Sequence, residues 1–156
     1  MKHLVFIASV LMFAGISCIH PNTSKQHEGY AEGYPTGYLQ WHKLGGLIKR
    51  GMEFRRLYAN NMAFQRTGKE FPVGTVLVKE ELSIIPRKVG ERPGSAFRLS
   101  VMRKVGQMKS SQQGWSFEAY DPNTKKKISA DKLDTSGCYL CHIQQAANDM
   151  VFSRIK

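Results

Sequence analysis

The chain has 156 residues, 23 of them Lys or Arg against 12 Asp or Glu, which gives a formal net charge of +11. Its length suits one domain with one hydrophobic core, and its sequence has no internal repeat. Such a charge is typical of nucleic-acid-binding proteins, but the basic residues are scattered in short groups and the N-terminus predicts export. We therefore expect no nucleic-acid partner. The basic surface instead suits anionic lipid headgroups or an acidic protein.

The first residues have the layout of a secretory signal peptide. Lys2 precedes an uncharged run from Leu4 to Ser17 that is rich in Leu, Ile, Val, Phe and Met. A short basic region before a short apolar region directs export and is then removed. The run is also shorter than the roughly 20 residues that span a membrane. We predict a signal peptide over residues 1–17.

A cysteine follows this run directly. Gly15-Ile16-Ser17-Cys18 resembles a bacterial lipobox, although Gly15 stands where that motif usually has Leu, Val or Ile. Cys18 is the third cysteine of the chain, and without lipidation it would be an unpaired thiol in an oxidising compartment. Lipidation of Cys18 would therefore explain its presence. We predict a periplasmic or cell-envelope protein, anchored to a bacterial membrane through a lipid-anchored tether over residues 18–34. Cleavage that leaves Cys18 unmodified, or removes it, is the alternative.

Residues 35–156 are predicted to form the domain. The clearest element is the strand at 75–85, which opens with β-branched residues and ends at Pro86. The expected class is α+β, an antiparallel β-sheet with packed helices on one side. In chain order we expect a helix from Pro35 or Thr36, a strand at 52–58, a short helix at 60–67, strands at 75–85, 97–101 and 115–120, and a C-terminal helix at 141–152.

The sequence Cys138-Tyr139-Leu140-Cys141-His142 carries the strongest chemical signal. In an exported protein the pattern C-x-x-C-H is typical of covalent haem attachment. Cysteines three residues apart on a helix reach the two vinyl-derived carbons of a haem, and the adjacent histidine becomes the axial iron ligand. We predict one c-type haem in a single domain, covalently attached through Cys138 and Cys141, with His142 as the metal ligand.

Three other chemistries remain open for this motif. Zinc needs four ligands in a closed site, and Cys138, Cys141 and His142 supply three. A thioredoxin-like dithiol is expected near a βαβ unit, not at the C-terminus. A plain disulfide leaves His142 without a role. Haem attachment is the interpretation that explains all three residues.

The position of the motif bears on a sixth iron ligand. Met150 follows His142 on what is predicted to be the same helix, so it cannot easily reach the opposite face of the haem. A sixth ligand must then come from upstream, where nothing singles out one residue, and an open position for a small ligand is the alternative. The upstream candidates are Met62, Met102, Met108, His27 and His42.

Four blocks of the chain resemble the cytochrome P-460 and cytochrome c′-beta family, in the family's order. They are Pro35 to Trp41 (PTGYLQW), Phe71 to Lys88 (FPVGTVLVKEELSIIPRK), Gly114 to Tyr120 (GWSFEAY) and Cys138 to Ile155 (CYLCHIQQAANDMVFSRI). The resemblance implies an antiparallel sheet carrying one c-type haem with an open distal face, usually in a homodimer. One branch of the family oxidises hydroxylamine through a lysine bonded to the haem, an arginine and a carboxylate. The other branch has an apolar distal pocket and binds gases such as nitric oxide and carbon monoxide.

Carried over by position, the haem-bonding lysine of the family falls on Lys79. The arginine falls on Arg55, with Arg56 as the alternative. Lys79 alternates in register with Leu77, which places both side chains on one face of the strand. The competing interpretation is that Lys79 and Arg55 are surface residues that face solvent.

The carboxylate is where the chain departs from the family. Residues 97–114 contain no Asp or Glu, and Val101, Met102 and Val105 occupy this region instead. Hydroxylamine oxidation must remove protons, so it needs a base. Glu118 on the next strand is a substitute, but its position fits an outward-facing residue equally well. An apolar distal face also favours neutral diatomic ligands, because it imposes no desolvation penalty on them.

Three functions follow from these observations. The leading one is a haem protein that binds nitric oxide or a related small nitrogen species, with Arg55 as a hydrogen-bond donor. The second is a hydroxylamine-oxidising enzyme whose haem is bonded to Lys79. The third is an electron-transfer cytochrome, which needs a Met or His as sixth ligand and a redox partner protein.

Overall fold

The structure is a computed structural model that describes residues 32–106, 112–129 and 135–155. Within them the chain forms an antiparallel sheet with the strand order β1-β3-β4-β5-β6, and β2 pairs with β3 on the same edge as β1. The strands are β1 (His42–Lys43), β2 (Ile48–Arg50), β3 (Glu53–Ala59), β4 (Val76–Pro86), β5 (Glu91–Lys104) and β6 (Trp115–Tyr120).

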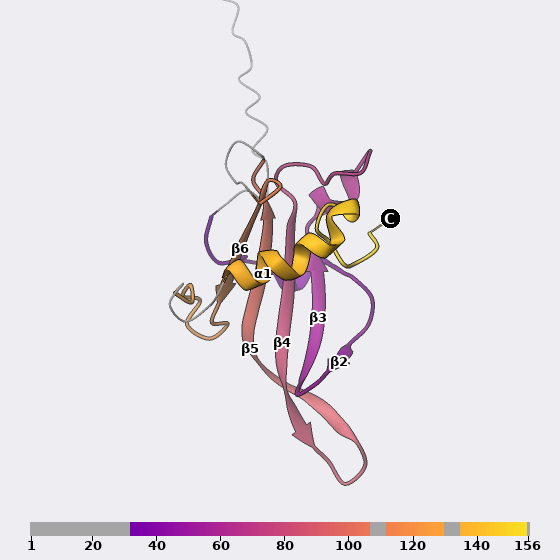
Figure 1. Cartoon of the computed structure of the whole chain (residues 1–156). Helices are drawn as coiled ribbons and strands as arrows, with labels where there is room; N and C mark the ends of the chain where they lie inside the picture. Colours follow the sequence, from indigo (N-terminus) through magenta and orange to yellow (C-terminus); the bar gives the residue numbers. More distant parts are fainter. Residues whose placement is uncertain (1–31, 107–111, 130–134, 156) are drawn as a thin grey trace, which may run out of the picture.

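The centre of the sheet is the long hairpin of β4 and β5. Leu77 pairs with Met102 and Lys79 with Ser100, and the register shifts just after Glu81. Beyond that irregularity the two strands continue as a twisted ribbon that extends away from the rest of the sheet (Figure 1). Since side chains alternate between the two faces of a strand, Leu77, Lys79 and Glu81 lie on one face of β4.

Each face of the sheet buries its own apolar cluster. The helix α1 (Thr135–His142) runs diagonally across the first face (Figure 1). The cluster on that face contains Ala59, Ala63, Phe71, Leu77, Met102, Trp115, Phe117, Met150 and Val151. The cluster on the opposite face contains Tyr38, Tyr58, Val76, Val78, Leu99, Val101 and Tyr120.

The predicted antiparallel sheet is confirmed, and the prediction of packed helices is wrong. Among the described residues there is one α-helix, α1, of eight residues. The other helical segments are 3-10 turns: η1 (Tyr38–Gln40), η2 (Asn61–Gln65) and η4 (Ile143–Asn148). The helices expected from Pro35 and at 60–67 are therefore single short turns. Before η1, Gly37 takes a left-handed conformation with φ of 78°, which an extended α-helix does not accommodate.

Two other predicted elements have different bounds. The strand expected at 97–101 is the middle of the longer β5, whose first half contains Pro93 and Gly94, residues that weaken strand predictions. The C-terminal helix expected at 141–152 is wrong, because α1 already ends at His142. After it, η4 leads to Asp149 and Met150, both of which have positive φ angles.

Several predictions concern residues outside the described part of the chain. They are the signal peptide at 1–17, the tether up to residue 31 with its lipidated Cys18, and the candidate ligands His27 and Met108. Within the described ranges, none of the helices has the length and apolar character needed to cross a membrane.

Candidate functional site

A pocket is lined by residues of the sheet and of α1 and the segment that follows it. Its volume is about 560 Å³, which is within the range of cofactor sites. One wall comes from the strands and the other from α1 and the chain segment that follows it. The strand wall includes Arg55, Leu57, Leu77, Lys79, Ser100, Met102 and Phe117, and the facing wall includes Cys138, Cys141, His142, Val151 and Phe152.

The three residues of the C-x-x-C-H motif all line this pocket. Cys138 and Cys141 lie one helical turn apart on α1, and His142 is the last residue of that helix. The two cysteines form no disulfide with each other. Within the described ranges, no group of three or more His, Cys, Asp or Glu side chains is arranged to hold a metal ion.

The imidazole of His142 is fixed on three sides. The centroid of its ring lies 5.3 Å from the ring centroid of Phe117 and 5.1 Å from the ring centroid of Phe152. Its Nδ1 atom lies 2.6 Å from the carbonyl oxygen of Met150. Because a carbonyl oxygen can only accept, Nδ1 carries the proton and Nε2 keeps its lone pair in the neutral ring.

The electrostatic environment keeps this ring neutral. Burial lowers the pKa of His142, the hydrogen bond to Met150 opposes that shift, and the positive charge of Lys79 lowers the pKa further. A neutral imidazole held through Nδ1, with Nε2 available, is the usual arrangement of a histidine that binds a metal.

Lys79 and Arg55 lie on the strand wall of the same pocket as His142. The alternative arginine, Arg56, does not lie there, because alternation along β3 turns it to the opposite face. There it donates to Glu80, which also accepts from Tyr58. The structure therefore brings together Lys79, Arg55 and the haem-attachment motif, and it leaves Arg56 apart from them.

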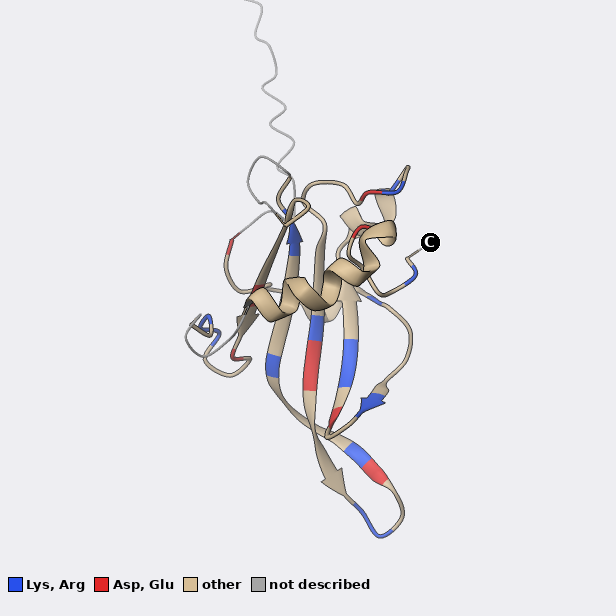
Figure 2. Cartoon of the chain, in the orientation of Figure 1, with Lys and Arg blue, Asp and Glu red and all other residues tan. Residues whose placement is uncertain are grey.

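A buried carboxylate, Glu81, stands next to Lys79 on this face. Its Oε1 atom lies 2.5 Å from Nζ of Lys79, and Arg98 and Ser100 donate to the same carboxylate. Figure 2 shows basic and acidic residues side by side along the central strands. Burial alone would raise the pKa of Glu81, but the hydrogen bonds from Arg98 and Lys79 outweigh it and lower the pKa. The alternation that places Lys79 beside Leu77 is the sequence signal that also places Glu81 there.

Glu118, the substitute carboxylate, lies on β6 where that strand borders the pocket, but its side chain is engaged by three donors. Its oxygens accept from Arg103 at 3.1 Å, Tyr120 at 2.9 Å and Lys127 at 2.6 Å. Burial raises the pKa of Glu118, and these hydrogen bonds more than reverse that effect, so the pKa is lowered. Strand alternation places this carboxylate with Tyr120, on the face opposite α1.

Of the described candidates for the sixth iron ligand, some line the pocket and others do not. Met102 lies on the strand wall of the pocket within the apolar cluster. Met62 and His42 are not among the residues that line the pocket, and Nε2 of His42 lies 2.9 Å from Asn61. Met150 is fully buried and contributes its carbonyl to His142.

The residues present fit a haem. The pocket has apolar side chains on both walls, two cysteines one turn apart and a neutral imidazole with an available nitrogen. This combination on an antiparallel sheet is compatible with a haem-binding site. The Cytochrome P460 family matches residues 35–153, and the chain therefore belongs to that family. No curated protein matches the chain.

Proposed function

We propose that the chain is an exported mono-haem c-type cytochrome that binds small ligands, nitric oxide foremost, in the pocket between α1 and the sheet. One observation carries the proposal: Cys138, Cys141 and His142 form one wall of a pocket whose facing wall is largely apolar. Haem c supplies, when bound, an iron atom with a coordination position for such a ligand.

The helix wall holds and orients the cofactor. Cys138 and Cys141 would hold the haem through thioether bonds, since their spacing on α1 matches its two attachment points. His142 would bind the iron through Nε2, because Nδ1 is occupied by the Met150 carbonyl. Phe117 and Phe152 keep the imidazole from rotating by packing against its ring.

The strand wall selects the ligand. Leu57, Leu77 and Phe117 keep this side of the pocket apolar, which favours a neutral diatomic molecule over a polar substrate. Arg55 provides a hydrogen-bond donor within the pocket. Its guanidinium is oriented by Glu53, whose Oε1 lies 2.5 Å from Nε of Arg55.

Hydroxylamine oxidation is the second candidate, and the presence of both Lys79 and Arg55 in the pocket favours it. Two features weigh against it. The amine of Lys79 is engaged in an ion pair with the carboxylate of Glu81, which a covalent bond to a haem carbon would have to break. Both Glu81 and Glu118 are saturated with donors and have lowered pKa values, which makes them weak bases. Electron transfer is the third candidate, with Met102 as the sixth ligand on the pocket wall.

The cellular setting is part of the same proposal. The predicted signal peptide and the lipobox-like position of Cys18 support a location in the periplasm or cell envelope, with a lipid anchor to a bacterial membrane. A homodimer and a redox partner protein are the expected macromolecular contacts. The basic surface, with a net charge of +11, supports docking of an acidic partner.

The visible spectrum of the purified holoprotein, with and without nitric oxide, tests this function. We expect a five-coordinate spectrum that shifts on addition of nitric oxide and is the same in wild type and Lys79→Ala. A strongly red-shifted haem band that reverts in Lys79→Ala would instead support hydroxylamine oxidation. A six-coordinate spectrum lost in Met102→Ala would support electron transfer.

A further inference from the structure

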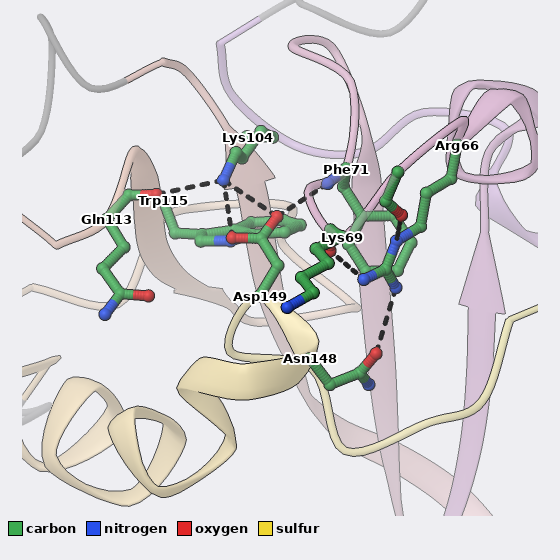
Figure 3. Close-up of polar contacts among 9 residues, drawn as sticks. Arg66, Lys69, Phe71, Lys104, Gln113, Trp115, Asn148 and Asp149 are labelled. Atoms are coloured by element: carbon green, nitrogen blue, oxygen red, sulfur yellow. Dashed lines mark hydrogen bonds and ion pairs between the residues drawn. The ribbon is translucent and has the colours of Figure 1, made fainter.

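A buried polar cluster holds the chain segment that follows the haem-attachment motif (Figure 3). The carboxylate of Asp149 accepts from Nζ of Lys104 at 2.7 and 2.8 Å and from the backbone N–H of Phe71 at 2.7 Å. It also accepts from Nε1 of Trp115 at 3.2 Å. These donors come from β5, from the start of β6 and from the loop before β4, so Asp149 joins three distant parts of the chain.

The cluster is almost completely removed from solvent. The side chains of Lys104 and Asp149 are 3% and 4% exposed, and Trp115 is fully buried. Lys104 also donates to the carbonyl oxygen of Gln113 at 3.0 Å. A buried ion pair is tolerated only when further hydrogen bonds satisfy both charges, and here those bonds are present.

The backbone at this point is strained. Asp149 has φ and ψ of 49°, and Met150 has φ of 68°. The left-handed region is unfavourable for residues with a Cβ atom, and Met lacks the short polar side chain that makes it tolerable for Asp. Two such residues in succession persist only where the surroundings hold them. Here the backbone N–H groups of Asp149 and Met150 donate to carbonyl oxygens of η4, and the side-chain partners of Asp149 hold the turn against the sheet.

The strained turn has a consequence for the haem ligand. It reverses the chain after η4, so that the Met150 carbonyl oxygen points back to Nδ1 of His142 at 2.6 Å. The side chain of Met150 is fully buried in the apolar cluster, which fixes the same residue from the other side. The orientation of the imidazole thus depends on a turn that Lys104 of β5 holds through its ion pair with Asp149.

We propose that Lys104 and Asp149 are positioning residues for His142. The ion pair holds the left-handed turn, and the turn aims the Met150 carbonyl that fixes the tautomer and direction of the imidazole. A second partner of this kind strengthens the bond between a histidine and its metal, and its loss commonly weakens metal binding about 10- to 100-fold. The inference rests on the part of the proposed function in which His142 binds the haem iron, and it is independent of which small ligand the pocket takes.

Resonance Raman spectroscopy of the ferrous holoprotein tests this inference through the iron–histidine stretching band. The variants are Lys104→Met, which keeps the length of the side chain without its charge, and Asp149→Asn, which keeps size and tolerates left-handed backbone. We expect a downshifted, broadened band in both. We also expect about tenfold more of the nitric oxide complex to have lost its iron–histidine bond. Leu99→Ala, a truncation in the cluster on the opposite face, is the control and keeps the wild-type band although it lowers Tm.

An unchanged band in both variants, together with a fall in Tm like that of Leu99→Ala, would overturn the inference and leave the cluster a structural one. If neither variant yields folded holoprotein, Trp115→Phe removes the Nε1 donor to Asp149 together with part of a buried ring but keeps an aromatic side chain. This variant must shift the band in the same direction, and an unshifted band there overturns the inference. Failure of the proposed function is a separate result: the wild-type protein itself would show no iron–histidine band or no response to nitric oxide.

Discussion

The amine of Lys79 lies 2.5 Å from the carboxylate of Glu81, which is fully buried. The two residues are neighbours on one face of β4, so the strand itself brings them together. Arg98 binds the other oxygen of the same carboxylate. Lys79 is therefore engaged in an ion pair at the edge of the pocket, and this pairing favours ligand binding over a covalent link between the lysine and the haem.

The Glu81 pairing has a measurable effect on stability. Glu81→Gln removes the buried charge that Lys79 and Arg98 share, and we expect the free energy of unfolding to fall by about 1.5 to 3 kcal/mol. Glu91→Gln is the matched control, because the ion pair between Glu91 and Lys49 is exposed to solvent, and exposed ion pairs contribute little to stability. Urea unfolding of the two variants measures the difference in the free energy of unfolding. Equal decreases in both variants would mean that the buried Glu81 cluster stabilises the fold no more than an exposed ion pair.

Adjacent arginines on β3 provide a paired test of the pocket. Arg55 lines the pocket, whereas Arg56 donates to Glu80 on the opposite face. We expect Arg55→Leu to speed dissociation of nitric oxide about tenfold, the effect of losing one hydrogen bond from a charged donor. Arg56→Leu should leave the rate unchanged. Stopped-flow measurements decide the point, and a similar change in both variants would argue against Arg55 as the donor.

The lowered pKa of Glu118 predicts how its contribution depends on pH. A carboxylate whose pKa is lower in the folded state than its usual 4.5 stabilises the fold above that value. The stabilisation is lost as pH falls through the lower, folded-state pKa. We therefore expect the free energy of unfolding of Glu118→Gln to be lower than that of wild type by about 1.5 to 3 kcal/mol at pH 7. This gap in stability should narrow as the pH drops below 4.5, the usual pKa of the carboxyl group. Thermal unfolding across this range measures the gap, and a gap that stays constant would contradict the assignment.

Substitutions of Leu77 and Leu99 distinguish a loss of core packing from a change in the pocket. Leu99 is fully buried on the face opposite α1, and Leu77 packs on the pocket side and lines the pocket. Each change to Ala should cost about 2 to 5 kcal/mol of stability, because both remove buried methyl groups. Leu77→Ala should also alter the visible haem band, and Leu99→Ala should not. A haem band that responds equally to both changes would place the cofactor elsewhere.

Much of the sheet follows from local sequence patterns. The strand β6 has the predicted bounds, and β4 differs from its prediction by one residue at each end. Alternation with Leu77 placed Lys79 correctly on the pocket face, and the spacing of the C-x-x-C-H motif placed its residues on one helical turn. The same alternation rule, applied two residues further, reaches Glu81, although the family resemblance points to residues 97–114 for the carboxylate.

The remaining features depend on contacts between residues far apart in the sequence. Polar and apolar residues after His142 fit a continued helix, but the chain forms the 3-10 segment η4 there, and Asp149 at its end forms bonds with Lys104 and Phe71. Neither partner can be identified from the residues around Asp149. The burial of Lys104, in a basic chain with many exposed lysines, is likewise set by the fold and not by the local pattern.

The mass of the haem-bearing peptides from digested holoprotein shows directly whether the haem is bonded to Lys79. We expect one haem on the peptide that contains Cys138 and Cys141, and a separate, unmodified peptide that contains Lys79. A haem joined to both peptides would contradict it, because the Lys79–Glu81 pair would then not exist in the mature protein and hydroxylamine oxidation would become the leading function.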